Sequence, residues 1–186
     1  MTYLYKNYVV KEGIKINNDS KNNLRYLMEV PLRNDFNKSI LVILKNPSKA
    51  TKYISDHTIN NVLNFCNSRR YSKVYIMNLY STYSTDPKGI AKLIKDNQEE
   101  IAIGKNNDKI LEQTSKKVED IIVAWGSNTF GCTMKYKHRI EEVTKIIQGK
   151  NLYYVESKSK CGWYPKHAQI WSVNSNITMD KWSPPF

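Results

Sequence analysis

The chain has 186 residues, 40% of them hydrophobic and 25% charged, and carries a formal net charge of +12 at pH 7. This length fits one domain with a single substantial core, and no apolar run is long enough to cross a bilayer. The excess of positive charge favours a polyanionic partner, above all nucleic acid, although a lysine-rich surface encoded by an AT-rich genome explains the same excess.

The N-terminus and the cysteines indicate the compartment. The first ten residues, MTYLYKNYVV, are apolar only in patches and include Lys6, unlike a signal or transit peptide. The three cysteines are widely spaced and form no CxxC pair, which argues against both a zinc site and a disulfide framework. We therefore expect a cytoplasmic protein, a monomer with one domain over residues 1–186.

The first predicted elements are two strands rich in Tyr, Leu and Val. They cover residues 3–10 and 24–32, with the polar residues 15–23 between them, and predict an N-terminal ribbon. A third apolar run, residues 40–44, predicts a strand that is buried on both faces of a parallel sheet.

The stretch SILVILKNPSKA, residues 39–50, places polar residues at the end of this strand. Pro47 ends the strand and biases Asn46 toward an extended backbone. Asn46 then lies at the carboxyl end of the strand, where open α/β sheets place their ligands. A plain exit from strand to turn explains the same residues.

Strands and helices alternate through the rest of the chain, which is the pattern of a parallel sheet covered on both faces. The predicted fold is three-layer α/β/α, with a central, mainly parallel sheet of four strands plus the N-terminal ribbon. Ile101, Ile110 and Leu111 are the expected buried positions of the third helix. The further predicted strands cover residues 73–79, 120–125 and 152–155. The first predicted helix begins at caps in residues 55–58 and ends near Arg69, and the second covers residues 88–95. The third covers residues 98–115 with a weak point at 104–107, and the fourth includes residues 140–147 and ends at a C-cap at Gly149.

The strand ends carry motifs in a specific order: KNPS at residues 45–48, VYIMNL at 74–79, IIVAWGS at 121–127, and a basic, aromatic loop with Pro165 and His167. In this order they resemble the motifs of the uracil-DNA glycosylase superfamily. The details of KNPS, DHT, DP, ND and WG also resemble, over about residues 39–175, a family of uncharacterised bacterial and phage proteins known as a domain of unknown function. That second resemblance is the closer one.

The first resemblance implies a monofunctional DNA glycosylase that flips a base out of DNA and cleaves its N-glycosidic bond with water, without metal or cofactor. Asn46 would orient the water, because an amide cannot take a proton at neutral pH. Asn78 would hydrogen-bond the base, and His167 or nearby backbone amides would stabilise the departing base. Asp56 is either a helix cap or a carboxylate that stabilises the positive sugar.

The remaining predicted site residues surround these. Tyr53, Tyr80 or Tyr83 would stack on the flipped base, while Trp125 is expected in the core. The expected phosphate contacts are Lys49, Lys158, Lys160, Lys166 and Arg139.

Ser48 determines the expected substrate. Uracil-specific members of the superfamily carry there a tyrosine that blocks position 5 of the pyrimidine, so the serine predicts a 5-modified pyrimidine such as a modified phage cytosine. DNA repair and antiviral defence are both compatible roles. A non-catalytic nucleic-acid-binding module and a nucleoside or nucleotide N-glycosidase are the alternatives.

Overall fold

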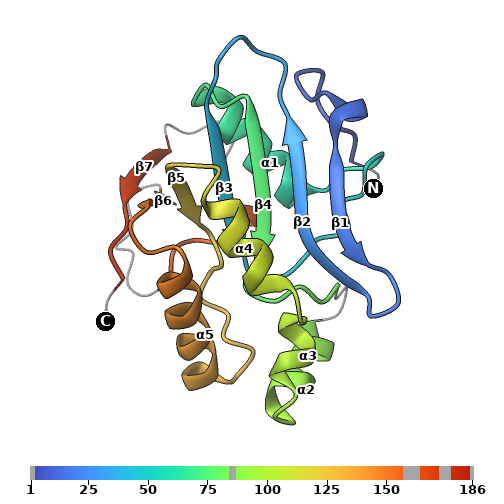
Figure 1. Ribbon diagram of the computed structural model, residues 1–186, viewed down its shortest axis with the longest axis vertical. Helices are drawn as coiled ribbons and strands as arrows, with labels where there is room; N and C mark the ends of the chain where they lie inside the picture. The colour runs from blue at the N-terminus through green and yellow to red at the C-terminus, as the bar shows by residue number, and fades with distance from the viewer. Residues whose placement is uncertain (1–2, 84–86, 157–163, 172–176, 185–186) are drawn as a thin grey trace.

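The computed structural model describes residues 3–83, 87–156, 164–171 and 177–184 and shows one mixed sheet with helices on both faces (Figure 1). The seven strands lie in the order β1-β2-β4-β3-β5-β6-β7. None of the described helices is long and apolar enough to span a membrane. The strands are β1 (Lys15–Asp19), β2 (Leu24–Pro31), β3 (Ser39–Leu44), β4 (Lys73–Asn78), β5 (Asp120–Val123), β6 (Asn151–Glu156) and β7 (Thr178–Lys181).

The centre of the sheet is parallel and its flanks are antiparallel. Strand β3 pairs in parallel with β4 and β5, and β5 pairs in parallel with β6. Strand β2 joins β4 and strand β7 joins β6, both antiparallel. The predicted α/β class is confirmed. The four strands predicted to be parallel, β3 to β6, form this centre, but the sheet as a whole has seven strands and not four, because the ribbon is continuous with it through β2 and β7 extends the other side.

The N-terminal ribbon uses a different first strand from the predicted one. Strand β1 covers residues that the sequence analysis assigned to a connecting segment, whereas residues 3–10 make only single bridges, from Tyr3 to Ser55 and from Val9 to Leu32. As an edge strand, β1 has exposed or half-buried side chains throughout, so it needs no apolar alternation.

Helices cover the two faces of the sheet unequally. Figure 1 shows α4 and α5 in front of the sheet and α1 behind it. Along β3, Ile40, Val42 and Leu44 belong to the core on the α1 face, and Leu41 and Ile43 to the core on the opposite face. All five are fully buried, as the apolar run predicts. The helices are η1 (Lys11–Gly13), α1 (His57–Ser68), α2 (Pro87–Lys95), α3 (Glu99–Ile103), α4 (Asn107–Ser115), α5 (Thr133–Ile146) and η2 (Ala168–Ile170).

The predicted helix over residues 98–115 is two helices, α3 and α4, separated at the expected weak point. Gly104 lies between them at φ +83°, and a Cβ there would stand 2.9 Å from Leu24 Cδ1, so the chain turns close against β2. Ile101 of α3 is 56% exposed, contrary to its predicted burial, whereas in α4 Ile110 is half-buried and Leu111 is buried as predicted. At the end of α5 the C-cap residue is Ile147, not Gly149.

Candidate functional site

A cavity of about 510 Å³ opens beside the residues that follow β3 and β5. Its volume falls within the range of about 300–1,000 Å³ that small-molecule sites occupy. Because β3 and β5 run parallel, their carboxyl ends meet at one edge of the sheet, as predicted. The wall consists of residues 45–49, Thr58 of α1, residues 126–128 with Phe130, and residues 164–167 with Gln169 and Ile170.

Five predicted site residues come together in this wall: Asn46, Ser48, Lys49, Lys166 and His167. They come from segments separated by more than 100 residues of chain, and the sheet edge unites them. The other described candidates lie elsewhere. Lys158 and Lys160 fall outside the described residues.

The described wall of the cavity is basic and contains no acidic side chain. Lys45, Lys49 and Lys166 supply positive charge, and Asn46, Asn128, Gln169 and the hydroxyls of Ser48, Thr58 and Ser127 supply neutral polar groups. Phe130, Pro47 and Pro165 add apolar surface. A wall of this composition favours a ligand that combines an anionic group with a planar or apolar body.

His167 is held as a neutral hydrogen-bond donor. Its Nδ1 accepts the backbone N–H of Gln169 at 3.2 Å, so the proton of the neutral ring lies on Nε2. Burial and the positive charge of Lys45 lower the pKa of His167 to about 4, although Asp56 acts in the opposite direction. The imidazole therefore stays uncharged at neutral pH.

Gly126 allows the loop after β5 to approach His167. Its φ is +75°, and a Cβ at this position would stand 2.9 Å from the Cβ of His167. Any larger residue would be strained by its backbone and would displace His167. Gly126 therefore has a direct steric role in the site.

Lys45 lines the cavity but was not among the predicted site residues. Its side chain is buried, with Nζ donating to the backbone carbonyl of Asn128 at 3.1 Å and lying 5.0 Å from the Phe130 ring centroid. Burial lowers the pKa of Lys45 to about 8. Its position in the sequence could have predicted this burial, because a lysine directly between a fully buried strand and Asn46 has little room to reach solvent.

Asp56 is a structural cap. One carboxylate oxygen accepts the backbone N–H of Ile59 at 2.9 Å, the N-cap bond of α1, and the other accepts the N–H of Ala50 at 3.0 Å. Of the two roles predicted for Asp56, these contacts support that of a helix cap. It is not part of the cavity wall and instead ties the segment after Ser48 to α1.

Asn78 and the candidate stacking tyrosines, Tyr53, Tyr80 and Tyr83, lie outside the wall. Asn78 is 1% exposed, and its side-chain amide has no hydrogen-bond partner within the described part of the chain. Tyr80 is fully buried, with its hydroxyl donating to Glu99 at 3.0 Å, so the prediction that it stacks on a ligand is wrong. Tyr53 is 77% exposed. Trp125 is buried edge-to-face on Trp182, in the core as predicted.

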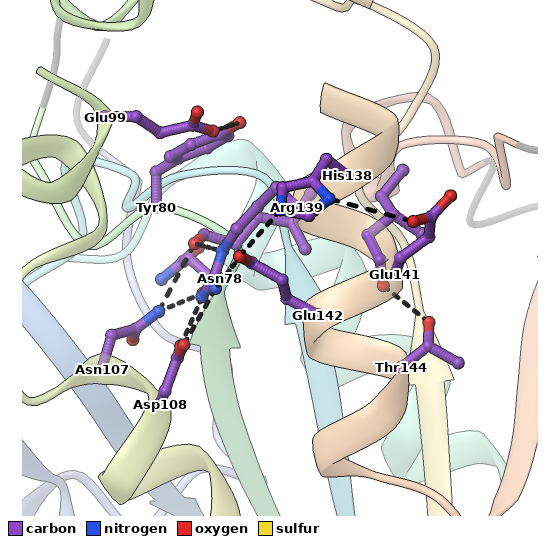
Figure 2. A network of polar contacts seen from close by, with 12 residues as sticks. Asn78, Tyr80, Glu99, Asn107, Asp108, His138, Arg139, Glu141, Glu142 and Thr144 are labelled. Carbon is purple, nitrogen blue, oxygen red and sulfur yellow. Dashed lines mark hydrogen bonds and ion pairs between the residues drawn. The ribbon is translucent and has the colours of Figure 1, made fainter. Parts of the chain in front are cut away.

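Arg139 binds other groups of the protein and supports the fold, instead of contacting a phosphate. Its guanidinium is 1% exposed and pairs with Asp108 and Glu142, and its Nε donates to the Leu79 carbonyl at 3.0 Å (Figure 2). The predicted phosphate contact is therefore wrong, because the guanidinium is buried and four of its five N–H donors are bound to Asp108, Glu142 and the Leu79 carbonyl. Beside it the Asn107 amide donates to the Asn78 carbonyl at 3.0 Å. Together these bonds hold the carboxyl end of β4.

Comparison with known proteins assigns the chain to a family without assigning an activity. No curated protein and no solved structure matches it. One family model, described as "Protein of unknown function (DUF1643)", matches residues 25–167, well over half of the chain and a span that includes Lys45, Asn46 and His167. The chain therefore belongs to the DUF1643 family, in agreement with the closer of the two resemblances.

Proposed function

We propose that this protein is a monofunctional DNA glycosylase of uracil-DNA glycosylase type that excises a 5-modified pyrimidine with water. The observation that carries the proposal is the convergence of Asn46 and His167 on one basic cavity at the carboxyl ends of parallel strands. A flipped base needs a concave site with a hydrogen-bond donor for the departing ring and a polar group for the water.

The chemistry assigns one task to each residue. The C1′–N bond breaks with its electron pair leaving on the base, and the oxygen of water forms a new bond to C1′. The Asn46 amide orients that water, and the Nε2–H of His167 donates to the base as its negative charge develops. A neutral imidazole suits this task because it does not need to lose a proton. The proton released by the water ends on the free base.

Ser48 supports a 5-modified pyrimidine as the substrate. It is half-buried in the cavity wall, and its hydroxyl lies 3.5 Å from Nη2 of Arg25, a guanidinium that is itself fully buried and donates to the Ala50 carbonyl. A side chain this small leaves space beside the ring that a tyrosine would fill.

A panel of matched oligonucleotides tests this proposal. Release of uracil, thymine, 5-hydroxymethylcytosine and glucosyl-5-hydroxymethylcytosine is compared for the wild type and Ser48→Tyr. We expect a 5-modified base to be released fastest by the wild type and Ser48→Tyr to shift preference toward uracil. Fastest release of uracil, with a ranking that Ser48→Tyr leaves unchanged, would show that position 48 does not select the base.

We further propose that the protein acts as a monomer on cytoplasmic DNA, in DNA repair or in antiviral defence. The basic wall supports an alternative substrate as well, because a cavity of this volume with three lysines also suits a free nucleotide. Release of base from mononucleotides, without any DNA requirement, would favour that nucleotide N-glycosidase.

A further inference from the structure

Lys45 is a buried cation without a counter-charge. Only 8% of the residue is exposed, and no carboxylate in the described ranges forms an ion pair with it. Its ammonium group contacts the carbonyl of Asn128 and the face of Phe130. An ammonium group has three donors, and one carbonyl with one ring face does not replace the hydration that burial removes.

The rest of the wall does not neutralise this charge. The wall groups beside Lys45 that carry or can carry charge are Lys49, Tyr164, Lys166 and His167, and the charge of Asp56 acts on His167. Both carboxylate oxygens of Asp56 are bonded to backbone N–H groups. The cavity is thus organised so that negative charge beside Lys45 has to come from a ligand.

We propose that Lys45 is a catalytic residue whose ammonium group contacts the departing base and stabilises the negative charge that this base acquires. The inference rests on the proposed glycosylase function and deepens it. When the C1′–N bond breaks, the bonding pair moves onto the pyrimidine ring. Lys45 and the Nε2–H of His167 then share that charge, and the ring is protonated after it has separated from the sugar.

The depth of Lys45 distinguishes the base from a backbone phosphate as its ligand. Lys49 is exposed and Lys166 half-buried, whereas Lys45 is the least exposed of the three wall lysines. In a flipped nucleotide the base enters deepest and the phosphates stay at the rim. The buried cation therefore meets the base, and the more exposed lysines are left for phosphates.

The kinetic test uses single turnover at saturating DNA with Lys45→Met and Lys45→Arg. Lys38→Met is the matched control, because Lys38 also stands over an aromatic ring, 5.9 Å from the Tyr71 centroid, but lies before β3 at the opposite end of that strand. We expect Lys45→Met to lower the rate of base release at least about 100-fold, with DNA affinity nearly unchanged and the control unaffected. A wild-type rate in Lys45→Met overturns the proposal and leaves the glycosylase function standing.

The dependence of the rate on pH is a second test, because a purely structural role of Lys45 would not change it. With the pKa of Lys45 at about 8, the wild-type rate should fall as pH rises through this value. In Lys45→Arg the positive charge persists, and the alkaline fall should disappear. A fall that is the same in both proteins contradicts a charge-dependent role.

A binding test separates failure of this inference from failure of the proposed function. Its probes are 5-nitrouracil, a pyrimidine acidic enough to ionise near neutral pH, neutral uracil, and inorganic phosphate. We expect the wild type to bind 5-nitrouracil more tightly than uracil, and Lys45→Met to lose that preference. If no oligonucleotide releases a base, the binding preference still tests the role of Lys45. Tighter binding of 5-nitrouracil than of uracil supports a contact between Lys45 and an anionic base, and equal affinities overturn that contact. Tighter binding of phosphate than of 5-nitrouracil would overturn the assignment to a base.

Discussion

At the scale of single residues, the site combines groups that are unfavourable for folding. Lys45 is charged and buried, and Gly126 is held at positive φ so that His167 can approach. Such features persist where the surrounding structure holds them in place, and they concentrate at functional sites. Their cost to stability can be measured separately from activity.

Lys45→Met should stabilise the protein at neutral pH. The pKa of this lysine is lowered from its ordinary value of 10.5 to about 8, so as pH falls through this range the unfolded chain gains a proton before the folded one does. The folded state is therefore penalised below pH 8, by about 1–3 kcal/mol. We expect a melting temperature a few degrees higher than that of the wild type at pH 7, a difference that vanishes near pH 10.5. A lower melting temperature at pH 7 would contradict this assignment.

Gly126→Ala should cost more stability than Gly149→Ala. Both glycines have positive φ, +75° and +84°, but the new Cβ would stand 2.9 Å from His167 Cβ in the first case and has nothing within 4 Å in the second. Gly149→Ala thus measures backbone strain alone, about 1–2 kcal/mol, and Gly126→Ala adds the clash. Urea unfolding of both variants gives the difference. Equal losses would mean that the loop after β5 yields without moving His167.

At the scale of elements, the carboxyl end of β4 is fixed from two helices. Asn107 at the start of α4 binds the Asn78 carbonyl, and Arg139 of α5 binds the Leu79 carbonyl (Figure 2). These bonds keep β4 beside β3, which carries Lys45 and Asn46 at its end. The site therefore depends on packing far from its own wall.

Arg139→Met should destabilise the protein more than Asp108→Asn. Arg139 is buried and serves Asp108, Glu142 and the Leu79 carbonyl, so its loss leaves several groups without a partner, at a cost of about 3–5 kcal/mol. The Asp108 side chain is 44% exposed and is solvated when its partner changes, so Asp108→Asn should cost about 1 kcal/mol. Denaturant unfolding compares the two, and similar losses would contradict a scaffold centred on Arg139.

The elements predicted correctly from sequence include strands buried on both faces, such as β3, and helices with one apolar face, such as α1 and α2. The apolar run of β3 requires a position that is covered on both faces of the sheet. Asp56 caps α1 through a local hydrogen bond that does not depend on how the helix packs. Strand β1 was missed because edge strands tolerate polar residues, and β7 carries no strong apolar pattern. Arg139 was assigned to phosphate because its neighbours in sequence are basic; its partner Asp108 comes from another helix, which local sequence does not reveal.

At the scale of the whole molecule, the sheet edge gathers residues from both halves of the chain. Asn46, Ser48, Lys49, Lys166 and His167 were predicted to meet because parallel strands place their carboxyl ends together. Lys45 and Phe130 were not predicted, since their roles arise from contacts between loops. Tyr80 was misplaced because its loop folds back into the core.

Binding of DNA should weaken steeply as salt rises. The net charge of +12 and the lysines of the cavity wall predict counterion release from phosphates. We expect log Kd against log salt concentration to be linear, with Lys49→Met lowering the slope by about 1 and Lys38→Met leaving it unchanged. Fluorescence anisotropy with a labelled oligonucleotide measures Kd at each salt concentration. A flat dependence would remove DNA as the partner.

The most direct measurement is abasic-site formation by the wild type and Asn46→Ala on oligonucleotides that carry 5-modified pyrimidines. Asn46 is half-buried in the cavity wall, and its side-chain amide donates a hydrogen bond to the Pro47 carbonyl at 3.3 Å, a local contact whose loss should leave folding intact. We predict abasic sites with the wild type and a rate at least about 100-fold lower with Asn46→Ala, at unchanged DNA affinity and melting temperature. Absence of abasic sites on every base, or equal rates in the two proteins, would contradict the glycosylase proposal.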